Sequence, residues 1–169
     1  MPENIRNRIH MKGIAKMPFF IEENGEKQFD FEKFIPEPEY LSGDGNREWR
    51  IQVWGTKWNA YCTEIDGEDD IYFFSAWDAP LAVIRALAAL CPEEEVEYWW
   101  ASENVGDNSG YGYSEDGAMG VLRYPYKSSK ALAAYLKVWY PGREETCDYI
   151  RKDPETGGLY VDCKSRMED

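Results

Sequence analysis

The chain has 169 residues, of which 43% are hydrophobic and 15% aromatic, a composition typical of a globular protein. Its 32 acidic and 19 basic side chains give a formal net charge of -13, which disfavours direct nucleic-acid binding and favours basic proteins or cations as partners. Four cysteines without a C-x-x-C pair and a single histidine argue against a structural zinc site. No apolar run is long enough for a signal peptide or a membrane span, so we expect a cytoplasmic protein without metal or cofactor.

The first third of the chain predicts few regular elements. Residues 5–12 alternate apolar and polar side chains until Gly13, which predicts a strand. Residues 14–28 are compatible with either a strand or a short helix, and a turn is expected at the Asn-Gly pair near the end of this stretch. Residues 29–39 combine three phenylalanines with two prolines and predict an ordered, irregular connection, whereas residues 48–54 have an extended pattern.

The middle of the chain predicts a hairpin followed by a helix. Residues 60–65 and 71–76 read as paired strands, and the Asp-Gly pair between them marks the turn. Residues 80–90 carry a broad apolar surface that suits a helix lying on a sheet.

The remaining segments predict a second helix and further strands. Residues 96–101 read as a strand, and the glycines of residues 105–120 favour a bent strand pair over a phosphate-binding loop, because a turn and no helix follows them. Residues 128–140 predict an amphipathic helix capped by serine. Residues 146–151 and 159–164 predict a final hairpin.

The tight register of that final hairpin places Ile150 opposite Val161 and Asp148 opposite Cys163. Cys147 then lies on the other face of the hairpin. The register therefore predicts that Cys147 and Cys163 do not form a disulfide.

The order of these elements predicts an α+β protein with a ferredoxin-like antiparallel sheet, helices on one face, and a C-terminal helix and β-hairpin. We expect residues 1–124 to form the ferredoxin-like domain and residues 125–169 an appendage packed on it. At the centre of the chain lies an aromatic run, called here the aromatic motif: Trp54, Gly55, Thr56, Lys57, Trp58, Asn59, Ala60 and Tyr61.

The aromatic motif favours a structural role over a catalytic one. Gly55 suits a bend or bulge, Asn59 suits a turn hydrogen bond, and the two tryptophans suit core or half-buried anchors. Lys57 leaves two alternatives open: a cation held against aromatic faces, or a base whose pKa is lowered by burial. Cys62 is expected to be a small core residue, and His10 a solvated side chain, so an enzyme is disfavoured.

Together with Met1-Pro2 before a strand, Phe29-Asp30-Phe31, and Ala76-Trp77-x-x-Pro80 before an apolar helix, the aromatic motif resembles the YubB-like family of plasmid and phage proteins. The resemblance covers roughly residues 1–124. It implies a ferredoxin-like fold and a setting among mobile genetic elements, and the family offers no established enzymatic activity to transfer to this chain.

Acidic side chains gather in two stretches that are candidates for docking lysines and arginines of a partner: Asp66, Glu68, Asp69, Asp70, Glu93, Glu94, Glu95 and Glu97. The alternative is two solvated faces. The first stretch lacks the ligand spacing of a calcium loop. A ferredoxin-like layout leads us to expect the two stretches at opposite ends of the sheet, as separate patches.

The expected function is that of a non-enzymatic, acidic accessory protein of a phage or mobile element in the host cytoplasm. Its expected partner is a basic, nucleic-acid-binding host defence factor such as a CRISPR effector, which it would inhibit by presenting carboxylates in place of phosphates. The alternative is a small-ligand or regulatory module that uses the aromatic motif as a pocket.

Overall fold

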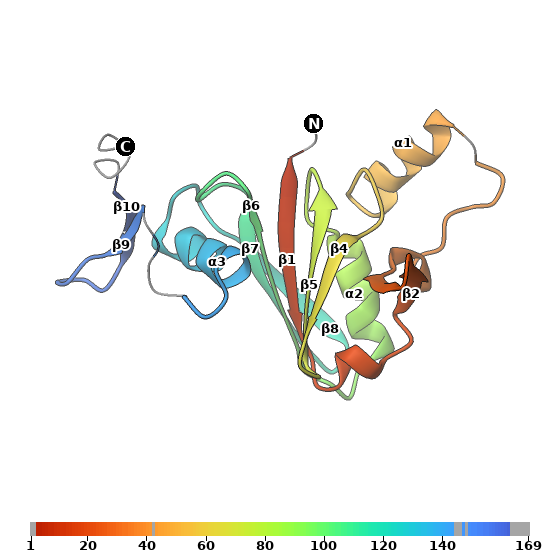
Figure 1. Cartoon of the computed structure of the whole chain (residues 1–169), viewed down its shortest axis with the longest axis horizontal. Helices are drawn as coiled ribbons and strands as arrows, with labels where there is room; N and C mark the ends of the chain where they lie inside the picture. Colours follow the sequence, from red (N-terminus) through yellow and green to blue (C-terminus); the bar gives the residue numbers. More distant parts are fainter. Residues whose placement is uncertain (1–2, 42, 144–146, 148, 163–169) are drawn as a thin grey trace.

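Six strands form one antiparallel sheet at the centre of the molecule (Figure 1). The computed structural model describes residues 3–41, 43–143, 147 and 149–162. The strand order is β4-β5-β1-β6-β7-β8, with β1 Asn4–His10, β4 Tyr61–Asp66, β5 Asp70–Ala76, β6 Val96–Ser102, β7 Ser109–Glu115 and β8 Ala118–Arg123. The neighbours β4, β5, β1 and β6 follow the strand order of a ferredoxin-like unit, and β7 and β8 extend the sheet beyond it. The predicted α+β class with a ferredoxin-like sheet is confirmed.

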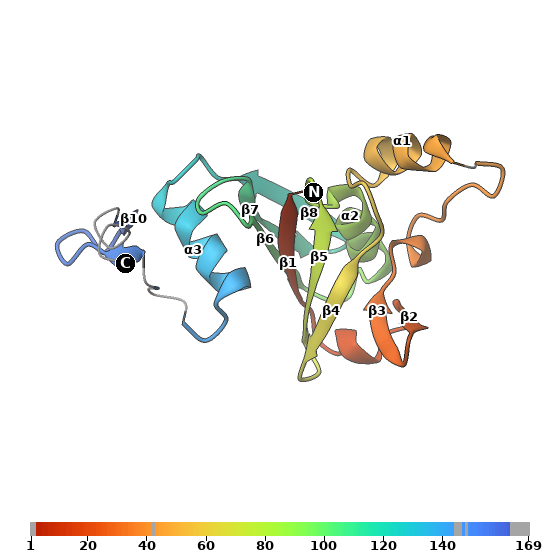
Figure 2. The same cartoon turned by 45° about the horizontal axis from the view of Figure 1, so that its top comes forward.

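Two helices cover opposite faces of the sheet, as both views show (Figures 1 and 2). Helix α2, Leu81–Leu90, packs against the face that carries Ile5 and Ile9 of β1. Helix α3, Ser129–Trp139, lies on the other face, where the Arg6 Nε of β1 donates to the carbonyl oxygen of Val138 at 2.7 Å. The predicted alternation of β1 is confirmed, because its apolar and basic side chains point to different helices.

The main core lies between the sheet and α2. Tyr98 and Trp100 of β6 are fully buried and stack with ring centroids 5.4 Å apart. The rings of Phe29 and Phe73 of β5 pack with their centroids 4.9 Å apart, and Trp54 is also buried in this cluster. Each fully buried large side chain contributes about 1.5–3 kcal/mol. A smaller core around Leu132 and Leu136 lies between the sheet and α3.

The prediction of an extended segment over residues 48–54 is wrong, because helix α1 spans Asp44–Val53. Only Trp49 and Val53, four positions apart, pack on the core from this helix, and Trp49 meets Trp54 with ring centroids 5.4 Å apart. Ile51 is 37% exposed. So few apolar positions give a weak helical period, which explains the error.

The segment that sequence left open, residues 14–28, contains a short 3-10 helix, Ile14–Lys16, and a hairpin of β2, Phe20–Glu23, and β3, Glu26–Phe29. The predicted turn is confirmed, since Asn24 and Gly25 adopt φ values of 52° and 81° and join the two strands. A second 3-10 helix, Phe31–Lys33, follows.

The C-terminal elements follow their predicted pattern. Ser128 caps α3, its Oγ accepting from the backbone nitrogen of Ala131 at 3.1 Å. The final hairpin pairs β9, Ile150–Lys152, with β10, Leu159–Val161, and Ile150 lies opposite Val161 as the tight register requires. The predicted pair of residues 148 and 163 lies outside the described residues.

Candidate functional site

Acidic side chains gather at one end of the sheet, called here the acidic end. His10, the last residue of β1, lies opposite both Asp70 of β5 and Glu97 of β6. Both neighbours run antiparallel to β1, so both begin where β1 ends. The β4–β5 turn and the α2–β6 connection therefore share one end of the sheet, the lower end in Figure 1. The expectation of opposite ends is wrong, because α2 returns the chain to the end at which β5 began.

A third segment adds two carboxylates that the sequence reading missed. Val96 lies opposite Ser114, so the β7–β8 turn after Glu115 reaches the same end of the sheet. Once β6, β7 and β8 are known to pair in sequence, the pairing of residues 96–118 places Glu115 and Asp116 at this end of the sheet. The acidic end comprises Asp66, Glu68, Asp69, Asp70, Glu93, Glu94, Glu95, Glu97, Glu115 and Asp116.

Several of these acids hold the fold together. Asp70 accepts from the Arg8 Nε at 3.0 Å and lies 3.1 Å from the His10 Nδ1. The Asp69 carboxylate accepts from the Gly13 backbone nitrogen at 2.8 Å, and that of Glu97 accepts from the Tyr111 hydroxyl at 2.9 Å. These contacts fasten the β4–β5 turn to the end of β1 and rigidify the acidic end.

Glu68 pairs with Lys16 at 2.9 Å, but both side chains are more than two-thirds exposed, so a partner could displace this pair. Five further exposed carboxylates of the acidic end have no ion pair within the described part of the chain: Asp66, Glu93, Glu95, Glu115 and Asp116. Among the described residues, no group of three or more His, Cys, Asp and Glu side chains could hold a metal ion.

Basic side chains at the centre of the sheet are bound against aromatic rings. The guanidinium groups of Arg6 and Arg8 lie 5.2 Å and 5.4 Å from the ring centroid of Tyr72, and Arg8 also lies 5.4 Å from Trp99. Lys137 of α3 covers the same Trp99 ring at 4.4 Å. Both arginine side chains are mostly buried, which leaves their charge poorly placed to meet an external partner.

The aromatic motif has a structural role in which Asn59 is central. Its Oδ1 accepts from the backbone nitrogens of Phe31 and Ala60, each at 2.8 Å, and its Nδ2 donates to Asp30 at 2.8 Å. The Trp54 indole donates to the carbonyl oxygen of Ile35 at 2.9 Å. The motif thus ties the segment before α1 to the sheet, with Trp54 buried and Trp58 39% exposed.

Lys57 is held against aromatic faces. Its ammonium lies 4.8 Å from the ring centroid of Trp58 and 5.1 Å from that of Trp77, and Arg47 lies 5.2 Å from the same Trp77 ring. Of the two alternatives for this lysine, the geometry matches the first, a cation-π contact.

Cys62 is exposed, so the expectation of a core position is wrong. The register of β4 shifts between Tyr61 and Glu64, and Cys62 adopts a positive φ of 49° there. A bulge of this kind breaks the in-and-out alternation of side chains along a strand, and here it leaves Cys62 pointing to solvent.

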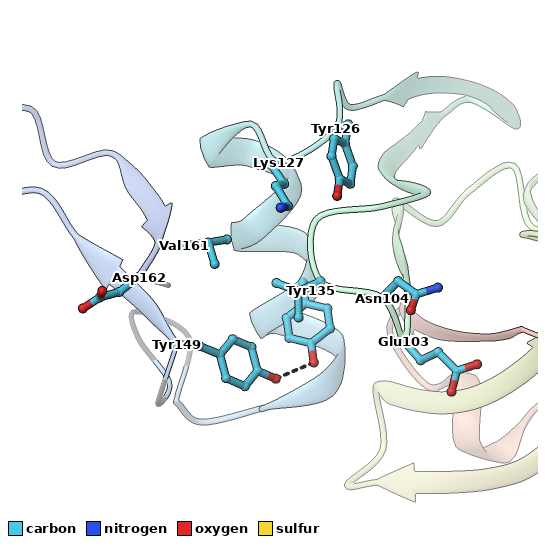
Figure 3. A pocket seen from close by; sticks show the side chains of 9 residues that line it. Glu103, Asn104, Tyr126, Lys127, Tyr135, Tyr149, Val161 and Asp162 are labelled. Carbon is cyan, nitrogen blue, oxygen red and sulfur yellow. Dashed lines mark hydrogen bonds between the residues drawn. The ribbon is translucent and has the colours of Figure 1, made fainter. Parts of the chain in front are cut away.

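A cavity of about 390 Å³ lies between α3, the β6–β7 loop and the C-terminal hairpin (Figure 3). Tyr135 and Tyr149 share a hydroxyl hydrogen bond of 2.8 Å in its wall, and Lys127 and Asn104 also line it. Burial and then the bonds to Tyr135 and Tyr140 raise the pKa of Tyr149 well above its usual value. No residue of the aromatic motif lines this cavity.

The fold and its strand order define a ferredoxin-like domain, and a family comparison agrees. The family model described as "Ferredoxin-like domain in Api92-like protein" matches residues 57–134, from the aromatic motif to the first half of α3. The protein api92 from Yersinia pseudotuberculosis, whose crystal structure is solved, has 17% sequence identity to this chain and a TM-score of 0.44. That match covers 60% of this chain and 43% of the api92 chain. No curated protein matches. Among the described residues, no helix is long and apolar enough to cross a membrane.

Proposed function

We propose that this protein is a non-enzymatic binding protein that docks its acidic end on a basic, nucleic-acid-binding protein and inhibits it. The observation that carries the proposal is the convergence of three acidic segments on one end of the sheet, fastened there by Asp69 and Asp70. A rigid group of carboxylates offers a basic surface the charge that it otherwise finds on phosphates.

The overall charge supports this proposal. The chain has a formal net charge of -13, and Arg6 and Arg8 are bound inside the fold against aromatic rings. Charge of one sign at one end accelerates association with a partner of the opposite sign and selects against other partners. In its narrower form, which rests on the resemblance to plasmid and phage proteins, the partner is a host defence factor such as a CRISPR effector in the host cytoplasm.

The test measures inhibition of DNA binding. A panel of purified basic nucleic-acid-binding proteins, including a CRISPR effector, is mixed with labelled duplex DNA, and the anisotropy is followed as this protein is added. Inhibition should weaken as salt rises, because screening reduces the attraction between exposed charges. A variant with Asp66, Glu93, Glu115 and Asp116 changed to lysine should lose most of its inhibition.

A matched control separates position from total charge. Glu22, Glu39, Glu48 and Glu155 are exposed acids outside the acidic end, and their change to lysine alters the net charge by the same amount. This control variant should inhibit nearly as well as the unchanged protein. Equal loss in both variants, or inhibition that does not depend on salt, contradicts docking through the acidic end.

Small-ligand binding is a second candidate function, favoured by the cavity beside Tyr149. A metabolite that fills it should raise Tm, because a ligand that binds only the folded state stabilises it. Lys127→Met should abolish that shift, whereas Lys130→Met on the neighbouring turn should not. Equal shifts in both variants contradict binding in this cavity.

A further inference from the structure

The outer edge of β8 carries backbone groups that point away from the sheet. The backbone nitrogen of Tyr124 donates to the carbonyl oxygen of Ser109 at 2.9 Å, which fixes the hydrogen-bonding phase of the β7–β8 pair. In an antiparallel pair, alternate residues bond to the neighbour, so Gly120 and Leu122 bond to β7. The N–H and C=O groups of Met119, Val121 and Arg123 therefore point outward. Within the described residues, no hydrogen bond to these outward groups is found.

The opposite edge of the sheet is covered. Thr63 of β4 receives a hydrogen bond from the Phe29 backbone nitrogen at 2.9 Å and donates its own backbone N–H to the side chain of Gln28 at 3.0 Å. Residues of the β2–β3 hairpin thus protect the β4 edge, which is also interrupted by a bulge. The β8 strand has a continuous register, no proline and no lysine, and it exposes 61% of Leu122. Of the features by which proteins usually protect an edge, β8 has a single charged side chain, Arg123, and no bulge.

We propose that β8 pairs antiparallel with β8 of a second copy of this chain, so that the two sheets join across a two-fold axis at Val121. Each Val121 then lies opposite its equivalent, and each Met119 lies opposite Arg123 of the second copy. The three outward-pointing pairs form roughly six intermolecular backbone hydrogen bonds. Such an interface is closed, because the same surface serves both copies.

The side chains of this register are complementary. Leu122 lies opposite Gly120 of the second copy, where a Cβ would find its nearest atom, the Tyr113 carbonyl oxygen, at 3.9 Å. A large exposed side chain therefore meets an open position. Arg123 already binds Asp78 at 3.3 Å, and no charge lies directly opposite it.

Charges at the ends of the paired strands favour the same occupant. The antiparallel direction brings the Asp116 turn of one copy to the segment through which the other copy leaves β8, which ends in the exposed Lys127. One carboxylate thus approaches one ammonium at each end of the interface. An unrelated peptide would bring neither this pair nor the fit of Leu122 to Gly120.

The salt dependence of self-association distinguishes it from docking of the acidic end. Two copies each carry a net charge of -13 and repel one another, so added salt should strengthen the dimer by screening that repulsion. Docking of the acidic end on a basic partner should instead weaken as salt is added, because screening reduces the attraction between opposite charges. One of the two proposals can therefore fail while the other stands.

Sedimentation equilibrium of the full chain tests the proposal, with Val121→Pro as the variant. Proline removes the outward N–H of residue 121 and is tolerated at a sheet edge where that group faces solvent. The unchanged chain should form dimers that tighten as salt rises, and Val121→Pro should raise the dimer Kd at least about tenfold, since it removes two of the intermolecular bonds and adds a clash. Val121→Thr keeps the N–H and the β-branch, and should change the Kd by less than about threefold, because only the side chain differs.

Two further measurements keep the test decisive if Val121→Pro does not fold. Leu122→Lys alters a side chain that is 61% exposed, so it should preserve the circular dichroism spectrum and abolish the dimer. Hydrogen exchange should show that the Met119, Val121 and Arg123 amides become protected as concentration rises. A monomer at every concentration and salt, a dimer that survives Leu122→Lys, or exchange at these amides that is independent of concentration overturns the proposal.

Discussion

The side-chain oxygen of Asn59 lies 2.8 Å from the backbone nitrogen of Phe31 and accepts its hydrogen bond. Through this bond the aromatic motif, which leads into β4, fixes the segment that follows the β2–β3 hairpin. Two further bonds of the same amide, to Ala60 and Asp30, make the side chain a junction between two backbone segments, residues 30–31 and residues 59–60. Asn59 thus explains why a polar residue lies among the aromatics of the motif.

We predict that Asn59→Ala lowers the free energy of unfolding by about 2–3 kcal/mol, because the Phe31 N–H loses its acceptor and the Asp30 carboxylate keeps, among the described residues, only the Glu32 backbone nitrogen as a donor. Urea denaturation measures the change. Lys33→Ala, on an exposed side chain of the same segment, should change stability by less than about 0.5 kcal/mol. Equal effects of the two substitutions would show that the amide is not the junction.

We predict that Gly110→Ala strongly destabilises the protein, whereas Gly120→Ala does not. A Cβ at residue 110 would lie 2.2 Å from the Trp100 ring of β6 and 2.4 Å from the Leu122 carbonyl oxygen of β8. Both neighbouring strands would have to move to accommodate it. Overpacking of this kind costs about 1–3 kcal/mol or more. At residue 120 the nearest atom is 3.9 Å away. Thermal unfolding of both variants at low protein concentration should show a lower Tm only for Gly110→Ala.

Local signals were enough to predict much of this fold. The alternation in β1, the Asp-Gly turn before β5, the apolar surface of α2 and the Ser128 cap of α3 each lie within a few residues of sequence, and each is present. Helix α1 was missed because only Trp49 and Val53 give it an apolar period.

The candidate site could not be predicted in the same way, because its assembly depends on pairing between distant strands. Asp70 and Glu97 both lie opposite His10 of β1, one on each side of that strand. No local sequence pattern links these three positions. The bulge that exposes Cys62 also arises from a register shift and not from residue type.

We predict that the protein loses stability as the pH rises from about 10 to 12. Burial, with smaller contributions from Cys62 and Glu103, raises the pKa of Tyr61 to about 12, whereas an unfolded tyrosine titrates near 10. The folded state therefore holds this proton more tightly than the unfolded state. Its contribution to stability is complete below pH 10 and is lost as the pH rises through the folded pKa.

The measurement for this prediction is the urea midpoint at a series of pH values, compared with Tyr61→Phe. Phenylalanine carries no proton to lose, so its midpoint should fall less steeply between pH 10 and 12. Tyr98 and Tyr111, whose pKa values are also raised by burial, retain part of the slope. An identical slope in both proteins would contradict the role of Tyr61.

The acidic end should contain acids of two kinds, and one pair of substitutions separates them. Asp70 is 17% exposed and accepts from Arg8, whereas Asp66 is exposed and has no ion pair among the described residues. We predict that Asp70→Asn lowers the free energy of unfolding by about 1–3 kcal/mol, because a partly buried, charge-assisted hydrogen bond is weakened. Asp66→Asn should change it by less than about 0.5 kcal/mol. Urea denaturation of both variants gives the comparison, and equal stabilities would mean that Asp70 is as free to meet a partner as Asp66.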